Sequence, residues 1–377
     1  MAKSEKIVTL KSNKSVLGNY LQSEEDALKI VVTDGTTELA RSFLYRMLND
    51  NVFGENQSVF ISLYELPRKA IFLESVAIEL TSFSPKLLSG KHPYTVTFLI
   101  GISYGHDASV EFKNADVVIC IGYAREYDFK DNEYLEPFFE EHVLNSKFYG
   151  EVIERYVKRN AKIIVLGNTA ATIISKYVKS IPIRNITTLS LLNLNIVAGQ
   201  VPLRIQCMLS LILSSRYIAA RIQCLPTEVK NIIIWGSNGS HSFPDCRYIR
   251  LTSGKPLPDA LKVWISNVLP CTIQNVACRS SLVNSIAYGL AEHCKIMWNG
   301  TPEDEWTSMG VLSDYSYSIR SGIFFSFPVI CRNRQYEIVK NFDMDRYIQR
   351  YIVGLSKLIF KEIEIACDIC GLKATDQ

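Results

Sequence analysis

Short apolar runs alternate with longer segments of helical period through the first 236 residues, and this alternation limits the fold more than any other feature. The runs lie at 28–32, 58–64, 94–100, 115–122, 161–168 and 232–236. Because they are apolar without in/out alternation, both faces of each strand should be covered, which is typical of a parallel sheet. Strands that alternate with helices indicate βαβ units. The sequence therefore predicts an α/β fold built on a parallel sheet.

The pattern changes after about residue 236. Longer helical patterns then surround two strands, at 307–314 and 322–330; the helices are expected at about 257–268, 276–297 and 344–370. Such a mixture predicts an α+β second domain. A chain of 377 residues is long enough for one large domain or two moderate ones. We expect the hinge between them within 214–231.

The charges are nearly balanced, with 41 Lys and Arg, 38 Asp and Glu, and a net charge of +3. A nucleic-acid or membrane-surface protein would gather its basic residues into one stripe, so neither kind of partner is expected. The N-terminal 29 residues carry spread lysines and no apolar core, which predicts neither a signal peptide nor a membrane anchor.

Ten cysteines are scattered without a secreted-type framework, which fits reduced thiols in a cytosolic compartment. Cys367 and Cys370 form a C-x-x-C pair without a second pair or a histidine nearby. Zinc needs four such ligands. We therefore expect this pair to pack within a helix, and no metal site.

Three motifs in order then suggest a family: "LGN" at 166–168, "IIIWG" at 232–236 and "GTPEDEWTSMGVLSD" at 300–314. Over roughly 28–370, the chain resembles the cytosolic-type malate dehydrogenases of the lactate/malate dehydrogenase superfamily, most closely their divergent malate dehydrogenase 1B branch. The resemblance implies a Rossmann-type, doubly wound domain for NAD at 28–190 and an α+β substrate domain at 191–377, after an N-terminal extension at 1–27. It also implies a homodimer in the cytoplasm, and the branch suggests a cilium or flagellum.

The resemblance also assigns catalytic positions, and this chain has changed them. The family uses a histidine as general base, oriented by an aspartate, and three arginines that clamp the substrate carboxylates. Asn238 stands at the histidine position and Asn193 at the aspartate position. The arginine positions and a substrate-contacting asparagine position are occupied by Glu126, Asn132, Ile196 and Ala171. None of these replacements retains the original functional group.

His241 lies three residues beyond the family's catalytic position. Each residue of extended chain spans about 3.3 Å, so we expect a surface or packing role for this histidine. The loop at 123–141 carries seven carboxylates and only Arg125 and Lys130 as cations, so it would repel a dicarboxylate; a solvated loop and helix start explains it better than a site for a basic partner.

The cofactor positions are partly kept. Rossmann folds bring glycines close to the pyrophosphate, but Gly35 is the one glycine of "VVTDGTTELA", with Asp34 and Thr37 at family glycine positions. Glu65 matches the acidic residue that receives the adenosine ribose hydroxyls. Gly122, Asn168 and Ser308 match positions along the nicotinamide half. We expect NAD to bind weakly or not at all.

Two interpretations of function follow. One is a catalytically inactive homologue that serves as a dimeric binding or structural protein within a larger assembly, with the apolar segment 204–222 either in the dimer interface or in the core of its own monomer. The other is an NAD-dependent oxidoreductase that interconverts L-malate and oxaloacetate or acts on a substrate that is not a dicarboxylate. The second would need another acid or base, such as Tyr123 or His241, beside the nicotinamide.

Overall fold

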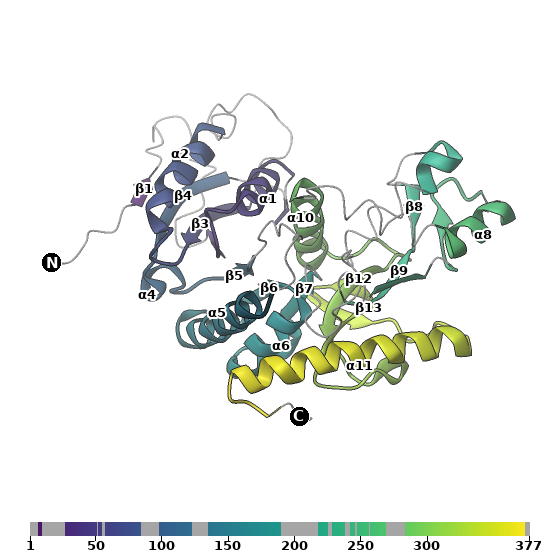
Figure 1. The fold of residues 1–377 in the computed structure, drawn as a ribbon. Helices are drawn as coiled ribbons and strands as arrows, with labels where there is room; N and C mark the ends of the chain where they lie inside the picture. The colour runs from purple at the N-terminus through teal and green to yellow at the C-terminus, as the bar shows by residue number, and fades with distance from the viewer. Residues whose placement is uncertain are drawn as a thin grey trace.

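One twelve-stranded sheet runs through the molecule (Figure 1). The computed structural model describes residues 7–9, 27–50, 52–54, 57–83, 98–122, 135–189, 218–224, 228–237, 242–245, 247–255, 257–268 and 283–373. The strands of the sheet are β1 (Ile7–Thr9), β2 (Leu28–Val32), β3 (Ser58–Tyr64), β4 (Phe98–Gly105), β5 (Val117–Cys120), β6 (Lys162–Leu166), β7 (Ile186–Leu189), β9 (Ile233–Gly236), β10 (Ser242–Asp245), β12 (Thr307–Leu312), β13 (Phe324–Arg332) and β14 (Gln335–Ile338). A separate pair joins β8 (Val229–Lys230) to β11 (Arg250–Leu251).

The helices cover both faces of this sheet. They are α1 (Glu38–Asn49), α2 (Leu73–Phe83), α4 (Ala108–Glu111), α5 (Leu135–Tyr156), α6 (Asn168–Tyr177), α8 (Asp259–Asn267), α10 (Val283–Asn299) and α11 (Arg346–Ile369), with 3-10 turns η2 (Ala70–Phe72), η4 (Ile183–Asn185) and η7 (Ser316–Ser318). Alternate residues of β2 face opposite layers: Ile30 and Val32 pack with α1, α2 and α10, whereas Val31 packs with α5 and α6. This two-sided burial is why the strands are apolar without alternation, and the α/β prediction is confirmed.

The first half of the sheet is parallel, in the order β4-β3-β2-β5-β6-β7. This is the strand order of a doubly wound dinucleotide-binding fold, in which the chain reverses direction beside the first strand. Here that switch point lies between β2 and β5, so the β2–α1 loop is the place to look for a nucleotide site. Antiparallel strands β12, β13, β9 and β10 continue the sheet from β7.

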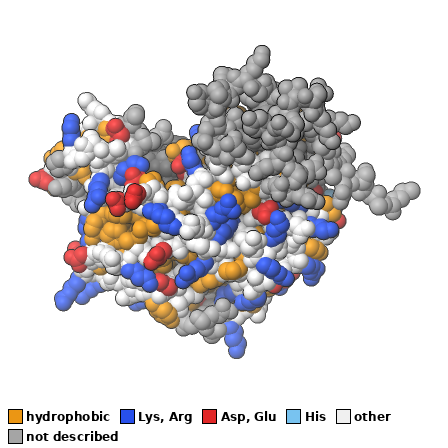
Figure 2. All heavy atoms as spheres, turned by 180° about the vertical axis from the view of Figure 1, so that it is seen from behind, with side chains coloured by type: hydrophobic (Ala, Val, Ile, Leu, Met, Phe, Trp, Pro, Cys, Tyr) orange, Lys and Arg blue, Asp and Glu red, His pale blue; other side chains and the backbone are white. Residues whose placement is uncertain are grey.

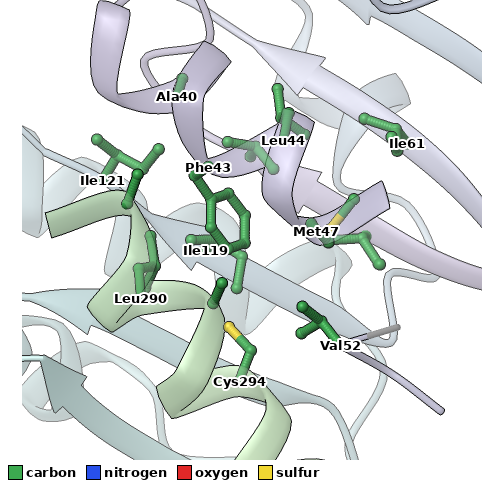
Figure 3. Packing of buried hydrophobic residues seen from close by; sticks show 14 of the residues in the cluster. Ala40, Phe43, Leu44, Met47, Val52, Ile61, Ile119, Ile121, Leu290 and Cys294 are labelled. Carbon is green, nitrogen blue, oxygen red and sulfur yellow. The ribbon is translucent and has the colours of Figure 1, made fainter. Parts of the chain in front are cut away.

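Helix α1 shows why the sequence folds as it does. The Thr37 side chain caps its first turn by accepting from the Ala40 amide. Residues three and four apart then form one apolar face, and this face packs against α10, where Phe43 lies close to Leu290 and Cys294 (Figure 3). The α1–α10 contact therefore joins residues that are about 250 positions apart in the sequence to one core.

Two sequence expectations need correction. The strand predicted at 94–100 is observed at Phe98–Gly105, because Ser103 and Tyr104 continue it beyond the apolar run. None of the apolar runs includes β7, whose centre is Thr187 and Thr188. Both threonines are fully buried, so burial here is not accompanied by an apolar sequence. Within the described residues, the helices and strands predicted after residue 256 agree with α8, α10, α11, β12 and β13 to within a few residues. The first part of the second predicted helix, residues 276–282, lies outside the described residues.

The described surface has mixed charges. Figure 2 shows Lys and Arg on one face of the molecule, spread among acidic and uncharged side chains and not gathered in one stripe. Of the helices that the structure describes, none has the length and apolarity to cross a bilayer.

We expect Phe43→Ala to lower the free energy of unfolding by about 3–5 kcal/mol, because Phe43 is fully buried between α1 and α10. Phe72→Ala is the matched control, since 61% of Phe72 is exposed and its loss should cost under about 1 kcal/mol. Urea unfolding of both variants measures the difference. Equal losses would show that the α1–α10 contact is not part of the core.

Candidate functional site

The β2–α1 loop, residues 33–37, begins with a buried carboxylate. Asp34 is 5% exposed and has a left-handed backbone, with φ at 52°. Few residues other than glycine adopt this conformation, although Asp and Asn tolerate it better than most. The loop therefore has a backbone conformation typical of glycine at position 34, and it carries a carboxylate side chain there.

The amide groups of this loop are used inside the chain. The Gly35 amide donates to the Tyr64 carbonyl at 3.2 Å, the Thr36 amide to Glu65 Oε2 at 3.3 Å, and the Thr37 amide to the Asp34 carbonyl at 3.0 Å. A phosphate binds at such a loop because free N–H groups point at it. These three amides already have acceptors, so a phosphate would have to displace them.

Glu65 is the residue matched to the ribose position, and it is 1% exposed. The Thr36 hydroxyl donates to its Oε2 at 2.6 Å, and the Leu66 amide donates to its Oε1 at 3.1 Å. Both carboxylate oxygens therefore have donors from the chain itself. The Glu65 carboxylate holds the β2–α1 loop against the end of β3.

Asp34 is held by hydroxyl groups and by no cation within hydrogen-bond distance among the described residues. The Thr33 hydroxyl donates to Asp34 Oδ2 at 2.8 Å, and the Tyr149 hydroxyl donates to the same oxygen at 3.3 Å. Burial, together with the nearby Glu65 charge, raises the pKa of Asp34 to about 6. A phosphate at this loop would meet two buried carboxylates.

A small cavity of about 10 Å³ lies behind Asp34, with room for about one water molecule. Its wall includes Cys120, Gly122, His142, Ser146 and Tyr149. Burial lowers the pKa of His142 to about 4, so its imidazole is neutral at pH 7. Gly122 has φ at 64°, and a Cβ there would lie 3.3 Å from His142 Cε1, so this glycine packs closely on the imidazole.

The residues matched to the nicotinamide half also bond to their own chain. The Asn168 side-chain amide donates to the Phe324 carbonyl at 2.9 Å, and the Ser308 hydroxyl accepts from the Ile234 amide at 2.9 Å. Both side chains are fully buried. Ala171 is equally buried and lies in the apolar layer between α6 and the sheet. The Asn168 bond joins α6 to β13, and the Ser308 bond joins β12 to β9.

Comparisons with known proteins agree with this architecture. The family model of the lactate/malate dehydrogenase alpha/beta C-terminal domain matches residues 208–367 of this chain. Cytoplasmic malate dehydrogenase of Taenia solium is 29% identical over 353 residues, which are 89% of this chain and 95% of that protein. The human cytoplasmic enzyme is 27% identical over 356 residues, which are 90% and 97% of the two chains. Over most of its length the chain is therefore similar to the malate dehydrogenases, and its second half matches the lactate/malate dehydrogenase C-terminal domain.

Solved structures share the fold. Malate dehydrogenase from Naegleria fowleri superposes with a TM-score of 0.76 at 22% identity, over 91% of this chain and 98% of that chain. Trichomonas vaginalis lactate dehydrogenase in complex with NADH and oxamate gives 0.75 at 18% identity, over 92% and 99%. The predicted Rossmann-type sheet and α+β second half are thereby confirmed.

The catalytic positions that the resemblance assigns lie outside the described residues. They are Glu126, Asn132, Asn193, Ile196 and Asn238, and His241 and Tyr123 lie outside as well. The structure therefore places only the cofactor-side candidates and Ala171. It brings Gly35 and Glu65 together at the end of β3, and it places Asn168 near Gly236 and Gly310.

The cysteine pair packs as a helix face. Cys367 is fully buried and Cys370 is 9% exposed, and both lie in the core cluster between α11 and the sheet with Ile363 and Ala366. Among the described residues there is no group of three His, Cys, Asp or Glu that could hold a metal ion.

Four structural residues of the site, three on α5 and one on β12, are not predicted by any of the sequence patterns. His142 and Tyr149 line the cavity together with Ser146, and their spacing of seven on α5 is the one signal that places them on a shared face. Gly310 lies where β12 approaches β7, and a Cβ there would overlap the Thr188 side chain. A glycine inside a strand is the available signal for such a close approach.

The raised pKa of Asp34 gives a pH test of this arrangement. Unfolded Asp loses its proton near pH 4, whereas folded Asp34 keeps it to about pH 6. Between these values the free energy of unfolding should fall as the pH rises, by on the order of 3 kcal/mol in total. We expect Asp34→Asn, which tolerates the left-handed backbone, to remove this fall and to stabilise the protein above pH 6.

Urea unfolding from pH 4 to pH 7 measures this effect. Asp107→Asn is the control, because hydrogen bonds from Ser109 lower the pKa of Asp107, so its loss should give no stabilisation at pH 7. Parallel pH profiles for the parent chain and Asp34→Asn would contradict the buried-carboxylate account.

Proposed function

We propose that this chain is a malate dehydrogenase-like protein that has kept the family fold and lost the family reaction, and that it acts as a binding or structural protein. The observation that carries the proposal is the closed β2–α1 loop, in which Glu65 accepts the amide and hydroxyl of Thr36. The three loop amides have internal acceptors, and Asp34 adds a second buried carboxylate. The residues present therefore fit the pyrophosphate and ribose of NAD poorly.

The sequence supports the same proposal on the substrate side. Asn238 has no basic nitrogen to accept a proton, and Asn193 carries no charge to stabilise a protonated base. General base catalysis is worth about 10²–10⁴ in rate, and each charged hydrogen bond to a carboxylate about 1.5–3 kcal/mol. Glu126, Asn132 and Ile196 offer no such cationic donor.

The alternative is an NAD-dependent oxidoreductase with a reduced affinity for its cofactor, acting on L-malate or on a substrate that is not a dicarboxylate. The matched positions Gly122, Asn168 and Ser308 favour it, as do relatives named malate dehydrogenase and a Trichomonas lactate dehydrogenase solved with NADH. Against it, Asn168 and Ser308 are buried and hydrogen-bonded to the chain. For this reason we favour the binding protein.

The relatives also suggest where and how such a protein acts. They are named cytoplasmic, so we place this chain in the cytoplasm, with the cilium or flagellum as a narrower suggestion from the branch it resembles. A homodimer would use the helices of the first half. Ile71, Phe72 and Ile78 are 78%, 61% and 59% exposed around η2 and α2. A groove of about 470 Å³ lies between α1 and the Glu79–Leu80 turn of α2.

The apolar segment 204–222 is expected either in the dimer interface or in the core of its own monomer. Only residues 218–222 of it are described, and Ile218 and Ala219 are 0% and 1% exposed within the monomer. These two side chains favour the core interpretation for the end of the segment.

Purified protein should reduce oxaloacetate with NADH at less than about 1 s⁻¹, the low end of ordinary enzymes. The double variant Asn193→Asp, Asn238→His should remain inactive, because the arginine clamp is still missing and substrate is not held at reaction distance. Measurable reduction of oxaloacetate should appear only after Glu126→Arg, Asn132→Arg and Ile196→Arg are added to the double variant. A spectrophotometric NADH assay measures all three proteins. Turnover by the parent chain, or by the double variant alone, would favour the oxidoreductase.

Sedimentation at micromolar concentration should give twice the chain mass, and Ile78→Asp should shift the protein to the monomer by placing a charge in the α2 face. Leu358→Asp is the matched control, since Leu358 is 44% exposed on α11, on the other part of the molecule. A monomer in the parent chain, or the same shift in both variants, would refute an interface at α2.

A further inference from the structure

A second groove of about 570 Å³ lies between η4 and the β13–β14 hairpin. Arg184 of η4 forms one wall, and Arg332 and Gln335 of the hairpin form the floor. The groove is remote from the β2–α1 loop: Lys162 begins β6 and η4 precedes β7, whereas the loop follows the carboxyl end of β2. Because β2, β6 and β7 run parallel, the groove lies at the amino-terminal ends of these strands and the loop lies at their carboxyl ends.

Arg332 is held in place by neutral oxygens. Its Nη1 donates to the Thr301 hydroxyl at 2.6 Å and to the Cys331 carbonyl at 2.8 Å. In the part of the chain that the structure describes, no carboxylate pairs with it. The guanidinium is therefore oriented in advance and still has N–H groups to offer, which lowers the entropy lost when it binds an anion.

Lys162 adds a buried positive charge behind the floor of the groove. It is 8% exposed, and its Nζ donates to Asn185 Oδ1 at 2.6 Å. The same oxygen accepts from the Gln335 side chain at 3.3 Å. No carboxylate within the described ranges pairs with Lys162. Burial, together with repulsion by Arg334, lowers the pKa of Lys162 to about 8.

Negative charge in the groove is limited. Asp314 Oδ2 forms an ion pair with Lys340 Nζ at 2.7 Å, so the charges of these two residues neutralise each other. Glu337 is then the one lining carboxylate without an ion pair among the described residues. Arg184 and Arg332 line the groove beside this single carboxylate, and Lys162 reaches it through Asn185 and Gln335, in a chain whose total charge is only +3. Uncompensated buried charge is costly unless a ligand supplies the opposite charge.

We propose that this groove binds the phosphate groups of a small phosphorylated molecule. Arg184 and Arg332 would contact the oxyanion, since an arginine fork matches phosphate oxygens in pairs. Lys162 strengthens the positive field from behind, and Gln335 contributes an amide donor. The volume of the groove is in the range of small-molecule sites. This site does not depend on whether NAD binds at the β2–α1 loop.

Inorganic tripolyphosphate is the probe, titrated into the full chain by calorimetry, with sodium chloride at matched ionic strength as the blank. We expect binding that Arg184→Gln and Arg332→Gln each weaken about tenfold. Arg159→Gln is the matched control, because this exposed arginine pairs with Glu154 outside the groove, and it should leave binding unchanged. Arg184 has no partner among the described residues, so Arg184→Gln should fold even if Arg332→Gln does not.

A second readout follows Lys162 directly. In protein with labelled lysines, with the Lys162 signal assigned through Lys162→Gln, the lysine pKa should rise when tripolyphosphate is added, because a bound anion favours the ammonium form. Absence of binding, equal weakening by Arg159→Gln, or an unchanged Lys162 titration would overturn the proposal. Citrate binding as tightly as tripolyphosphate would overturn the assignment to phosphate.

Discussion

The hydrogen bond from the Thr36 hydroxyl to the buried Glu65 carboxylate determines the state of the β2–α1 loop. It joins the first turn after β2 to the end of β3, and the Thr36 amide donates to the same oxygen. In a dinucleotide-binding fold this carboxylate and this loop are two separate contacts for one ligand. Here they contact each other, so the loop is stable without a ligand and the acidic group no longer faces one.

The second constraint is the proximity of two buried carboxylates. Asp34 and Glu65 repel each other, and the repulsion contributes to the raised pKa of Asp34. Hydroxyl groups of Thr33, Thr36 and Tyr149 solvate the pair in place of water or a cation. A bound pyrophosphate would bring further negative charge to this place, at a cost of about 1–4 kcal/mol for a charge at 4 Å. The same loop therefore supports its own fold and disfavours the family's cofactor.

The sequence predicts the sheet better than it predicts the site. β2, β3, β5 and β6 are recoverable because both of their faces are buried, and this leaves a continuous apolar run. β7 could not be predicted in this way, because its two central residues, Thr187 and Thr188, are polar although they are buried. The matched residues Glu65, Asn168 and Ser308 were identified by type and position, but their partners come from segments 29 to 156 residues away. Local patterns contain no information on such distant partners, so the internal hydrogen bonds could not be predicted.

Amide hydrogen exchange at residues 33–40, measured with and without 1 mM NADH, is the most direct test of whether internal hydrogen bonds close the β2–α1 loop. If the loop amides are already bonded to Tyr64, Glu65 and Asp34, NADH has no free donors there, and their exchange should be slow and unchanged by the nucleotide. Fast exchange of Gly35, Thr36 and Thr37 that slows markedly when NADH is added would contradict this closure, because that result requires an open loop that closes on the cofactor.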